Sequence, residues 1–126
     1  MITLFYGNSI DMNAEGLQSI LQLAEGDASV LMEIIFDSLQ YTPQLMDNLT
    51  QAVEQEDAKK IKLSAHSLKS SSAQIGALIM ADLCHHLEMK SGDGDISAAN
   101  QYLQQINLEY DNVQKELNEW KNQLGV

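Results

Sequence analysis

The segment "DAKKIKLSAHSLKSSSAQIG", residues 57–76, carries apolar or small side chains that recur three and four residues apart. That spacing is typical of one face of an α-helix. Asp57 can cap the start of such a helix, and Gly76 interrupts its end. The segment therefore predicts an amphipathic helix that packs against other helices. The positions that share its apolar face are Ala58, Ile61, Ala65, Leu68, Ser72 and Ile75.

The same helical periodicity continues on both sides of this segment. Short connections between several amphipathic helices favour an antiparallel arrangement. We therefore predict an all-α fold, an antiparallel four-helix bundle with an additional short N-terminal helix. Residues 1–10 are expected to form an N-terminal arm and residues 11–124 a single domain. The expected helices besides the one in residues 57–76 cover about residues 11–23, 28–53, 77–90 and 96–124.

The ends and interiors of these helices carry recognisable signals. Asp27 and Asp95 can cap the helices that follow them. Pro43 lies inside the second long helix and lacks a backbone donor, so we expect a kink near residues 39–43. The helix at 77–90 is apolar on most sides at its start, as a buried helix would be. The long apolar stripe of the last helix could be a coiled-coil seam, but we favour packing within the same bundle.

Composition and charge narrow the possible partners and location. The chain has 126 residues, the length of one domain, and a net charge of −11 with no arginine. Such a charge repels nucleic acid and anionic membranes. The single cysteine, Cys84, cannot form an internal disulfide, and no apolar run approaches the ~18 residues of a membrane span. We expect a cytoplasmic protein, and the initiator methionine and the end soon after the last helix favour a free-standing one.

His66 lies away from the apolar face of its helix. At ~100° per residue it points about 130° from the mean direction of that face. Ser70 and Leu63 point still further toward solvent, whereas Lys69 lies on the flank. An idle surface histidine is the simplest interpretation. However, four of the seven basic residues fall on this one helix and form a basic island around His66; they are Lys59, Lys60, Lys62 and Lys69.

The next helix offers a carboxylate to this histidine. His85 and Glu88 are three residues apart and therefore near one face of that helix. If the two helices pair antiparallel about Gly76, residues equidistant from the turn meet, and His66 and Glu88 can be neighbours. A carboxylate at imidazole Nδ1 fixes the tautomer and leaves Nε2 as the nucleophile.

The motif "HSLKSSSAQIG", residues 66–76, resembles that of the histidine-containing phosphotransfer (HPt) domain. The family motif reads approximately H-x-L-K-G/S-x-x-x-x-x-G, and the resemblance extends over about residues 11–120. It implies that His66 is phosphorylated, that Lys69 lies near the phosphoryl oxygens and that Glu88 bonds Nδ1 of the histidine. Ser70 stands where many members have glycine, beside the imidazole. His85 matches a position that is histidine in some members, with a weak role at most.

The resemblance also implies a function. The chain would accept a phosphoryl group on His66 from a receiver-domain aspartate and pass it to another receiver-domain aspartate in two-component signalling. The expected partners are receiver domains of a hybrid sensor histidine kinase and of a response regulator. The chain would be a monomeric phosphoryl carrier and no enzyme. It would need no cofactor of its own, because Mg²⁺ belongs to the receiver and no nucleotide-binding motif is present. Docking is expected around Leu63, Lys62 and Lys59.

Two other interpretations of the sequence remain open. The chain could be a non-catalytic helical adaptor that uses its last helix as a dimer seam. It could also bind metal through its histidines and Glu88, although a ferritin-like site needs further glutamates that the sequence does not supply. A calcium loop starting at Asp93 fails, because Ala98 and Gln104 occupy the positions that require glycine and glutamate.

Overall fold

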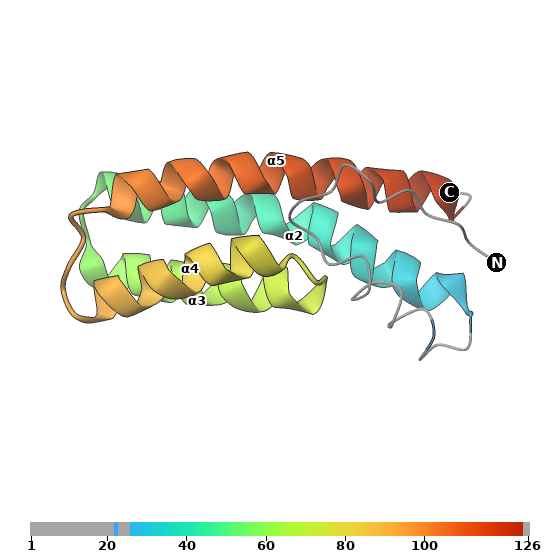
Figure 1. The fold of residues 1–126 in the computed structure, drawn as a ribbon, viewed down its shortest axis with the longest axis horizontal. Helices are drawn as coiled ribbons and strands as arrows, with labels where there is room; N and C mark the ends of the chain where they lie inside the picture. The colour runs from blue at the N-terminus through green and yellow to red at the C-terminus, as the bar shows by residue number, and fades with distance from the viewer. Residues whose placement is uncertain (1–21, 23–25, 125–126) are drawn as a thin grey trace.

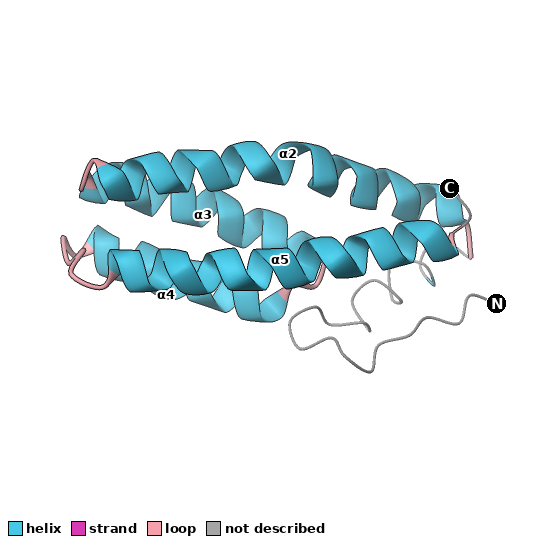
Figure 2. Ribbon diagram, turned by 90° about the horizontal axis from the view of Figure 1, so that it is seen from above, coloured by secondary structure: helices cyan, strands magenta, loops and turns pink. Residues whose placement is uncertain are grey.

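The computed structural model describes residue 22 and residues 26–124. In these residues the chain forms four helices and no strand: α2 (Ala28–Glu54), α3 (Ala58–Gln74), α4 (Leu78–Gly92) and α5 (Ala99–Gln123). Each helix packs against two others, so that α2, α3, α4 and α5 form a closed four-helix bundle (Figures 1 and 2). The predicted antiparallel bundle is confirmed. The expected arm at residues 1–10 and the short helix at 11–23, apart from residue 22, lie outside the described residues.

The core is built from the apolar faces that the periodicity indicates. Helix α3 buries Ile61, Ala65, Leu68 and Ser72, all members of its expected stripe. Helix α5 buries Ile106, Val113, Leu117 and Trp120 within this chain. Because these side chains are already covered by the bundle, the stripe of α5 serves intramolecular packing and is not an open coiled-coil seam.

Two predicted aspartate caps are present at the helix starts. The Asp27 carboxylate accepts a hydrogen bond from the backbone N–H of Ser29 at 2.9 Å. The Asp57 carboxylate accepts one from the backbone N–H of Lys60 at 3.1 Å. Each cap satisfies a helix donor that has no intrahelical partner, so each fixes where its helix begins.

Helix α5 begins later than predicted. We expected Asp95 to cap a helix starting at Ile96, but α5 starts at Ala99 and has no side-chain cap. Asp95 instead accepts bonds from the backbone N–H and the hydroxyl of Ser97, at 3.1 and 2.7 Å. This local Asx turn competes with the helix and delays its start.

The start of α4 is also more exposed than predicted. Leu78 and Ile79 are 51% and 41% exposed, and the helix buries Met80, Cys84 and Leu87 instead. The apolar residues at the start of α4 suggested more buried surface than the helix has. A helix in such a bundle buries only one of its faces and exposes the others.

Helix α2 continues through Pro43 without interruption. Figure 1 shows its ribbon changing direction between its two halves, as expected for an internal proline, which leaves a carbonyl one turn earlier without its donor. Close to this point the hydroxyl of Thr42 lies 3.4 Å from those of Ser38 and Ser71. These contacts join α2 to α3.

All three connections between the described helices use the same kind of turn. At the end of α3, the N–H of Ala77 donates to Ser72 O and that of Gly76 donates to Ala73 O. This pair of bonds defines a Schellman motif, whose penultimate residue takes a left-handed conformation. Gly76 and Gly94 occupy that position with φ of 77° and 82°. In the turn after α2 the same position is held by Glu56, at φ 53°.

Glu56→Gly is therefore expected to stabilise the protein by about 0.5–1 kcal/mol. A side chain in the left-handed region is strained, and glycine relieves that strain at some cost in chain entropy. Glu54→Gly, within the last turn of α2, is the matched control and should destabilise by a similar amount. Urea denaturation of the three proteins measures both changes. Equal destabilisation by both substitutions would contradict the strain at Glu56.

Candidate functional site

The side chain of His66 stands on the outer surface of α3, between the buried residues Ala65 and Leu68. It is 58% exposed, in agreement with the direction that the periodicity indicates. Leu63, one turn earlier, is also 58% exposed, and Ser70, one turn later, is exposed as well. The imidazole is thus open to a large partner and contributes little to the core.

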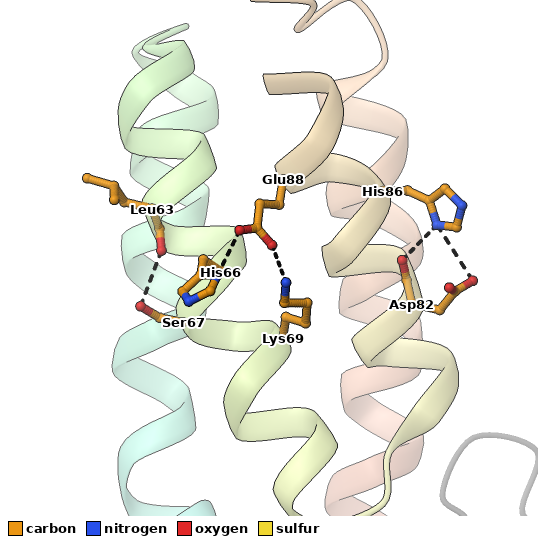
Figure 3. A network of polar contacts seen from close by, with 7 residues as sticks. All are labelled: Leu63, His66, Ser67, Lys69, Asp82, His86 and Glu88. Carbon is orange, nitrogen blue, oxygen red and sulfur yellow. Dashed lines mark hydrogen bonds and ion pairs between the residues drawn. The ribbon is translucent and has the colours of Figure 1, made fainter. Parts of the chain in front are cut away.

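Glu88 of α4 holds one edge of this imidazole. Its Oε2 lies 2.7 Å from Nδ1 of His66, although the two residues are 22 positions apart in the sequence (Figure 3). The Glu88 side chain is only 13% exposed. An ionised carboxylate can only accept, so Nδ1 carries the proton and donates. In the neutral ring this leaves the lone pair on Nε2, the nitrogen that faces away from Glu88.

Lys69 holds the other oxygen of the same carboxylate. Its Nζ lies 2.6 Å from Oε1 of Glu88, and the Lys69 side chain is 28% exposed. Burial raises the pKa of the Glu88 carboxyl, but the hydrogen bonds and positive charges of Lys69 and His66 outweigh it. The net pKa of Glu88 is below its ordinary value of 4.5. The carboxylate therefore bridges the lysine and the histidine and remains ionised at neutral pH.

The fold brings this network together through the turn at Gly76. The Schellman turn reverses the chain, so α3 and α4 run antiparallel and pack closely along their lengths. His66 and Lys69 lie three residues apart on α3, and both reach across to one residue of α4. Gly76 itself takes no part in the network, but the turn that it allows sets how His66 and Lys69 meet Glu88.

His85 does not join the network. Its side chain is exposed, it has no hydrogen bond to His66 or Glu88, and its ring packs edge-on against that of His86 with 6.0 Å between centroids. His86 in turn places Nδ1 2.8 Å from the backbone oxygen of Asp82 (Figure 3). The pairing of α3 with α4 therefore brings Glu88 to His66 and leaves both of these histidines outside the network.

Of the three expected docking residues, Leu63 borders a surface groove. Leu63 lines one side of a groove of about 290 Å³ between α2 and α3. Lys62 extends over α4, where a side-chain carbon at Gly92 would lie 3.6 Å from it. Lys59 is exposed. The sequence did not reveal the groove itself, because half of its wall comes from α2; its lining residues are Asn48, Gln51, Ala52, Gln55, Lys60, Leu63 and Ser64.

A second groove, of about 270 Å³, lies further along the same pair of helices. Tyr41, which is 62% exposed, stands at this groove together with Ser71. Its lining residues are Ile34, Asp37, Ser38, Tyr41, Ser71, Gln74 and Ile75. Along α3, the residues that line the first groove precede His66 and those that line the second follow it.

In the part of the chain that the structure describes, no three His, Cys, Asp or Glu side chains are arranged to hold a metal ion. Over the same residues, no helix has the length and apolar character needed to cross a membrane.

The fold and the site thus define a helical-bundle protein in which a largely buried carboxylate and a lysine hold an exposed imidazole. Comparison with known proteins then gives the family: the sequence matches the family model of the Hpt domain over residues 33–116, and the chain belongs to this family. Members are phosphocarriers that serve histidine phosphotransfer in phosphorelays, where they partner with receiver domains. Comparison with curated protein sequences gives no significant match.

Two solved structures share the fold. One is histidine-containing phosphotransfer protein B from Pseudomonas aeruginosa, with a TM-score of 0.76 and 24% identity over 91% of this chain and 98% of that one. The other is the HPT domain of a sensor hybrid histidine kinase from Shewanella, with a TM-score of 0.75 and 17% identity over 91% of this chain and 97% of that one. Each match spans nearly the whole of the other chain, and both support the helical-bundle fold of this one.

The lowered pKa of Glu88 predicts how the free energy of unfolding depends on pH. A carboxyl whose folded pKa lies below its unfolded one stabilises the fold above the unfolded value, near 4.5, and loses this contribution as the pH falls through the folded value. Glu88→Gln removes the titrating group. The loss of unfolding free energy on acidification from pH 7 to the acid side of that window should therefore be smaller in the variant than in the parent. Urea denaturation across this range measures it, and equal losses would contradict the ion pairing of Glu88.

Proposed function

We propose that His66 is the phosphoryl-accepting residue of this Hpt domain. It takes the phosphoryl group from an aspartate of one receiver domain and passes it to an aspartate of another. The observation that supports the proposal most directly is the exposed imidazole whose Nδ1 is held by a carboxylate, at 2.7 Å. This arrangement leaves Nε2 both accessible and unprotonated in the neutral ring, which is the state that a nucleophile needs.

The transfer step balances without any further reactant. The Nε2 lone pair attacks the phosphorus of the aspartyl phosphate, the P–N bond forms, and the bond to the carboxylate oxygen breaks. The aspartate leaves as a carboxylate, and the imidazole ring gains positive charge. The proton on Nδ1 stays where it is, facing Glu88, whose negative charge stabilises the ring. Attack by a second receiver's aspartate on the phosphohistidine reverses the step.

The receiver supplies what this chain lacks. In the proposed complex, Mg²⁺ is held by the receiver's own carboxylates, and this chain contributes no cofactor. Docking uses the exposed Leu63 with its groove, and the basic residues Lys59 and Lys62 attract the acidic site of the receiver. The receivers belong to a hybrid sensor kinase and to a response regulator, and the carrier acts in the cytoplasm as a monomer.

The test is phosphoryl transfer from a partner. The chain is incubated with a receiver domain whose aspartate carries labelled phosphoryl, in the presence of Mg²⁺. We expect label on this chain that is lost in acid and kept in base, as for a phosphoramidate. A receiver with its phosphoacceptor aspartate replaced by asparagine is the control. Absence of label with several phosphorylated receivers, or label that is stable in acid, would contradict the proposal.

A further inference from the structure

We infer that the second groove between α2 and α3 takes a basic side chain, arginine in preference to lysine, from the receiver domain that docks over His66. This inference rests on the proposed function, to which it adds a contact that selects among receivers and orients them. The groove is the one of about 270 Å³ that Asp37, Tyr41 and Gln74 help to line. We call it the acidic groove.

The first support is the charge of the acidic groove. Asp37 is the one charged residue among the described residues that line it, and its side chain is exposed. Within the described part of the chain, no hydrogen bond or ion pair joins Asp37 to another residue. Helix α2 has no basic residue, and Lys69, the lysine of α3 nearest to the groove in the sequence, is bonded to Glu88. The carboxylate of Asp37 is therefore free to attract a cation from a partner.

The neighbours of Asp37 match the rest of a basic side chain. Tyr41 stands one helical turn after Asp37 and is 62% exposed, so its ring is accessible to a cation. Ile34 and Ile75 line the same groove and offer apolar surface to a methylene stem. Arginine fits this set better than lysine, because its planar guanidinium stacks on an aromatic ring and donates to a carboxylate in a fork. This chain contains no arginine, so the preferred occupant belongs to another protein.

Hydroxyl groups of both helices supply further acceptors. Ser38 of α2 and Ser71 of α3 line the groove, and Oγ1 of Thr42 lies 3.4 Å from the Oγ atom of each. Thr42 is buried, so its contact with Ser71 ties the two walls together inside the bundle. A hydroxyl oxygen has two lone pairs, so Ser71 can accept from a guanidinium N–H while it stays in contact with Thr42. The acidic groove is therefore largely preformed, as ligand sites usually are.

The acidic groove lies close enough to His66 to be covered by the same receiver. Gln74, on the α3 wall, follows His66 by eight residues, which is about 12 Å along the helix and about 80° around it. A specific protein–protein interface covers about 800 Å² of each partner, a patch roughly 30 Å across. The groove therefore falls near the rim of the contact area of a receiver that reaches Nε2 of His66. Charges at such a rim act mainly on orientation and on the rate of association.

The distribution of charge along α3 favours one orientation of the receiver. Lys59 and Lys62 precede His66, whereas the α3 residues of the acidic groove follow it. A receiver that turns its acidic site toward the lysines and a basic side chain toward Asp37 meets opposite charges at both places. The reversed orientation meets like charges at both places, which disfavours it.

The affinity of receiver domains for charge variants tests the inference. The receivers are those used for labelling, and Kd is measured by titration at low salt. We expect Asp37→Asn to weaken binding about fivefold and Asp37→Lys more than about tenfold, with smaller differences at high salt. Asp47→Asn removes an exposed carboxylate of the same helix outside both grooves and should bind within about twofold of the parent. Equal Kd values for the parent and Asp37→Asn overturn the inference.

The aromatic ring is tested by a second pair of variants. Tyr41→Ala should weaken binding about threefold, because the cation loses the ring on which it stacks. Tyr41→Phe keeps the ring and should bind within about twofold of the parent. An equal loss in both variants would contradict the stacking of a guanidinium on this side chain.

A double-mutant cycle locates the basic side chain on the receiver. Each exposed arginine and lysine of the receiver is changed to glutamine in turn, and each receiver variant is titrated into the parent and into Asp37→Asn. One change should weaken binding to the parent about fivefold and binding to Asp37→Asn less than about twofold. If every change weakens the two alike, no basic side chain of the receiver meets Asp37, and the inference is wrong.

The inference and the proposed function fail in different ways. If receivers bind with the expected dependence on Asp37 but none labels the chain, the proposed phosphoryl transfer is wrong and the acidic groove stands. If label is transferred and Asp37→Asn binds as the parent does, the inference alone is wrong. If no receiver binds, both are wrong.

Discussion

His66→Gln is expected to abolish acid-labile labelling completely while the protein stays folded. Glutamine has no nucleophilic nitrogen, yet its amide can still donate a hydrogen bond to Glu88 from about the same place. The parent side chain is 58% exposed and lies outside the buried stripe of α3. The free energy of unfolding should therefore change by no more than about 0.5 kcal/mol. Labelling from a phosphorylated receiver and urea denaturation measure the two quantities.

His86→Gln is the matched control for this experiment. The His86 side chain is 53% exposed, close to the 58% of His66, and its Nδ1 is bonded to the backbone oxygen of Asp82. It has neither the carboxylate–lysine pair nor a place between the two grooves. The variant should label as the parent does. Label retained in His66→Gln would place the acceptor elsewhere, and unfolding of that variant would show that His66 supports the core.

The contact between His66 and Glu88 could be predicted because it depends on few variables. Helical periodicity gives the outward direction of His66, and Gly76 fixes the turn about which α3 and α4 pair. With the register set by the turn, the residues that meet follow from their distances along the chain. The Asp27 and Asp57 caps could be predicted because a cap involves only neighbouring residues. The same signal was wrong at Asp95, which forms a local turn with Ser97 instead.

The side-chain partner of Lys69 could not be read in the same way. Its ammonium stands at the end of four methylene groups, and its position on the flank of α3 allows it to reach solvent, a bound phosphoryl group or α4. The bond to Glu88 depends on how far α4 is rotated toward α3, which only the packed bundle determines. The two grooves could not be predicted from the sequence, because residues of both α2 and α3 form their walls.

His85 shows that two residues assigned to one helix face can have different surroundings. Residues three apart differ by about 60° around a helix, so His85 and Glu88 count as neighbours on a helical wheel. Cys84 and Leu87 beside them are fully buried in the bundle. That orientation of α4 turns Glu88 toward α3 and leaves His85 toward solvent, where its ring meets His86. A difference of 60° thus separates a residue of the network from one outside it.

The second large prediction compares Leu68→Ala with Leu63→Ala. The two substitutions make the same chemical change, one on the buried face of α3 and one on its exposed face. Leu68 is fully buried in the core, whereas Leu63 is 58% exposed beside the α2–α3 groove. Loss of the buried side chain should lower the free energy of unfolding by about 2–5 kcal/mol through lost transfer energy and the cavity left behind. Loss of the exposed one should change it by less than about 0.5 kcal/mol.

The effects on receiver binding should run in the opposite order. Leu63→Ala removes apolar surface from the proposed contact and should weaken the affinity for a receiver domain by about tenfold, since a buried leucine side chain is worth about 1.5–3 kcal/mol. Leu68→Ala should leave the affinity nearly unchanged under conditions where the variant remains folded. Titration of a receiver into each variant, followed by urea denaturation, gives both orders. If Leu63→Ala binds as the parent does, the receiver docks on another part of the surface around His66; if it unfolds like Leu68→Ala, the exposed face of α3 contributes to the core.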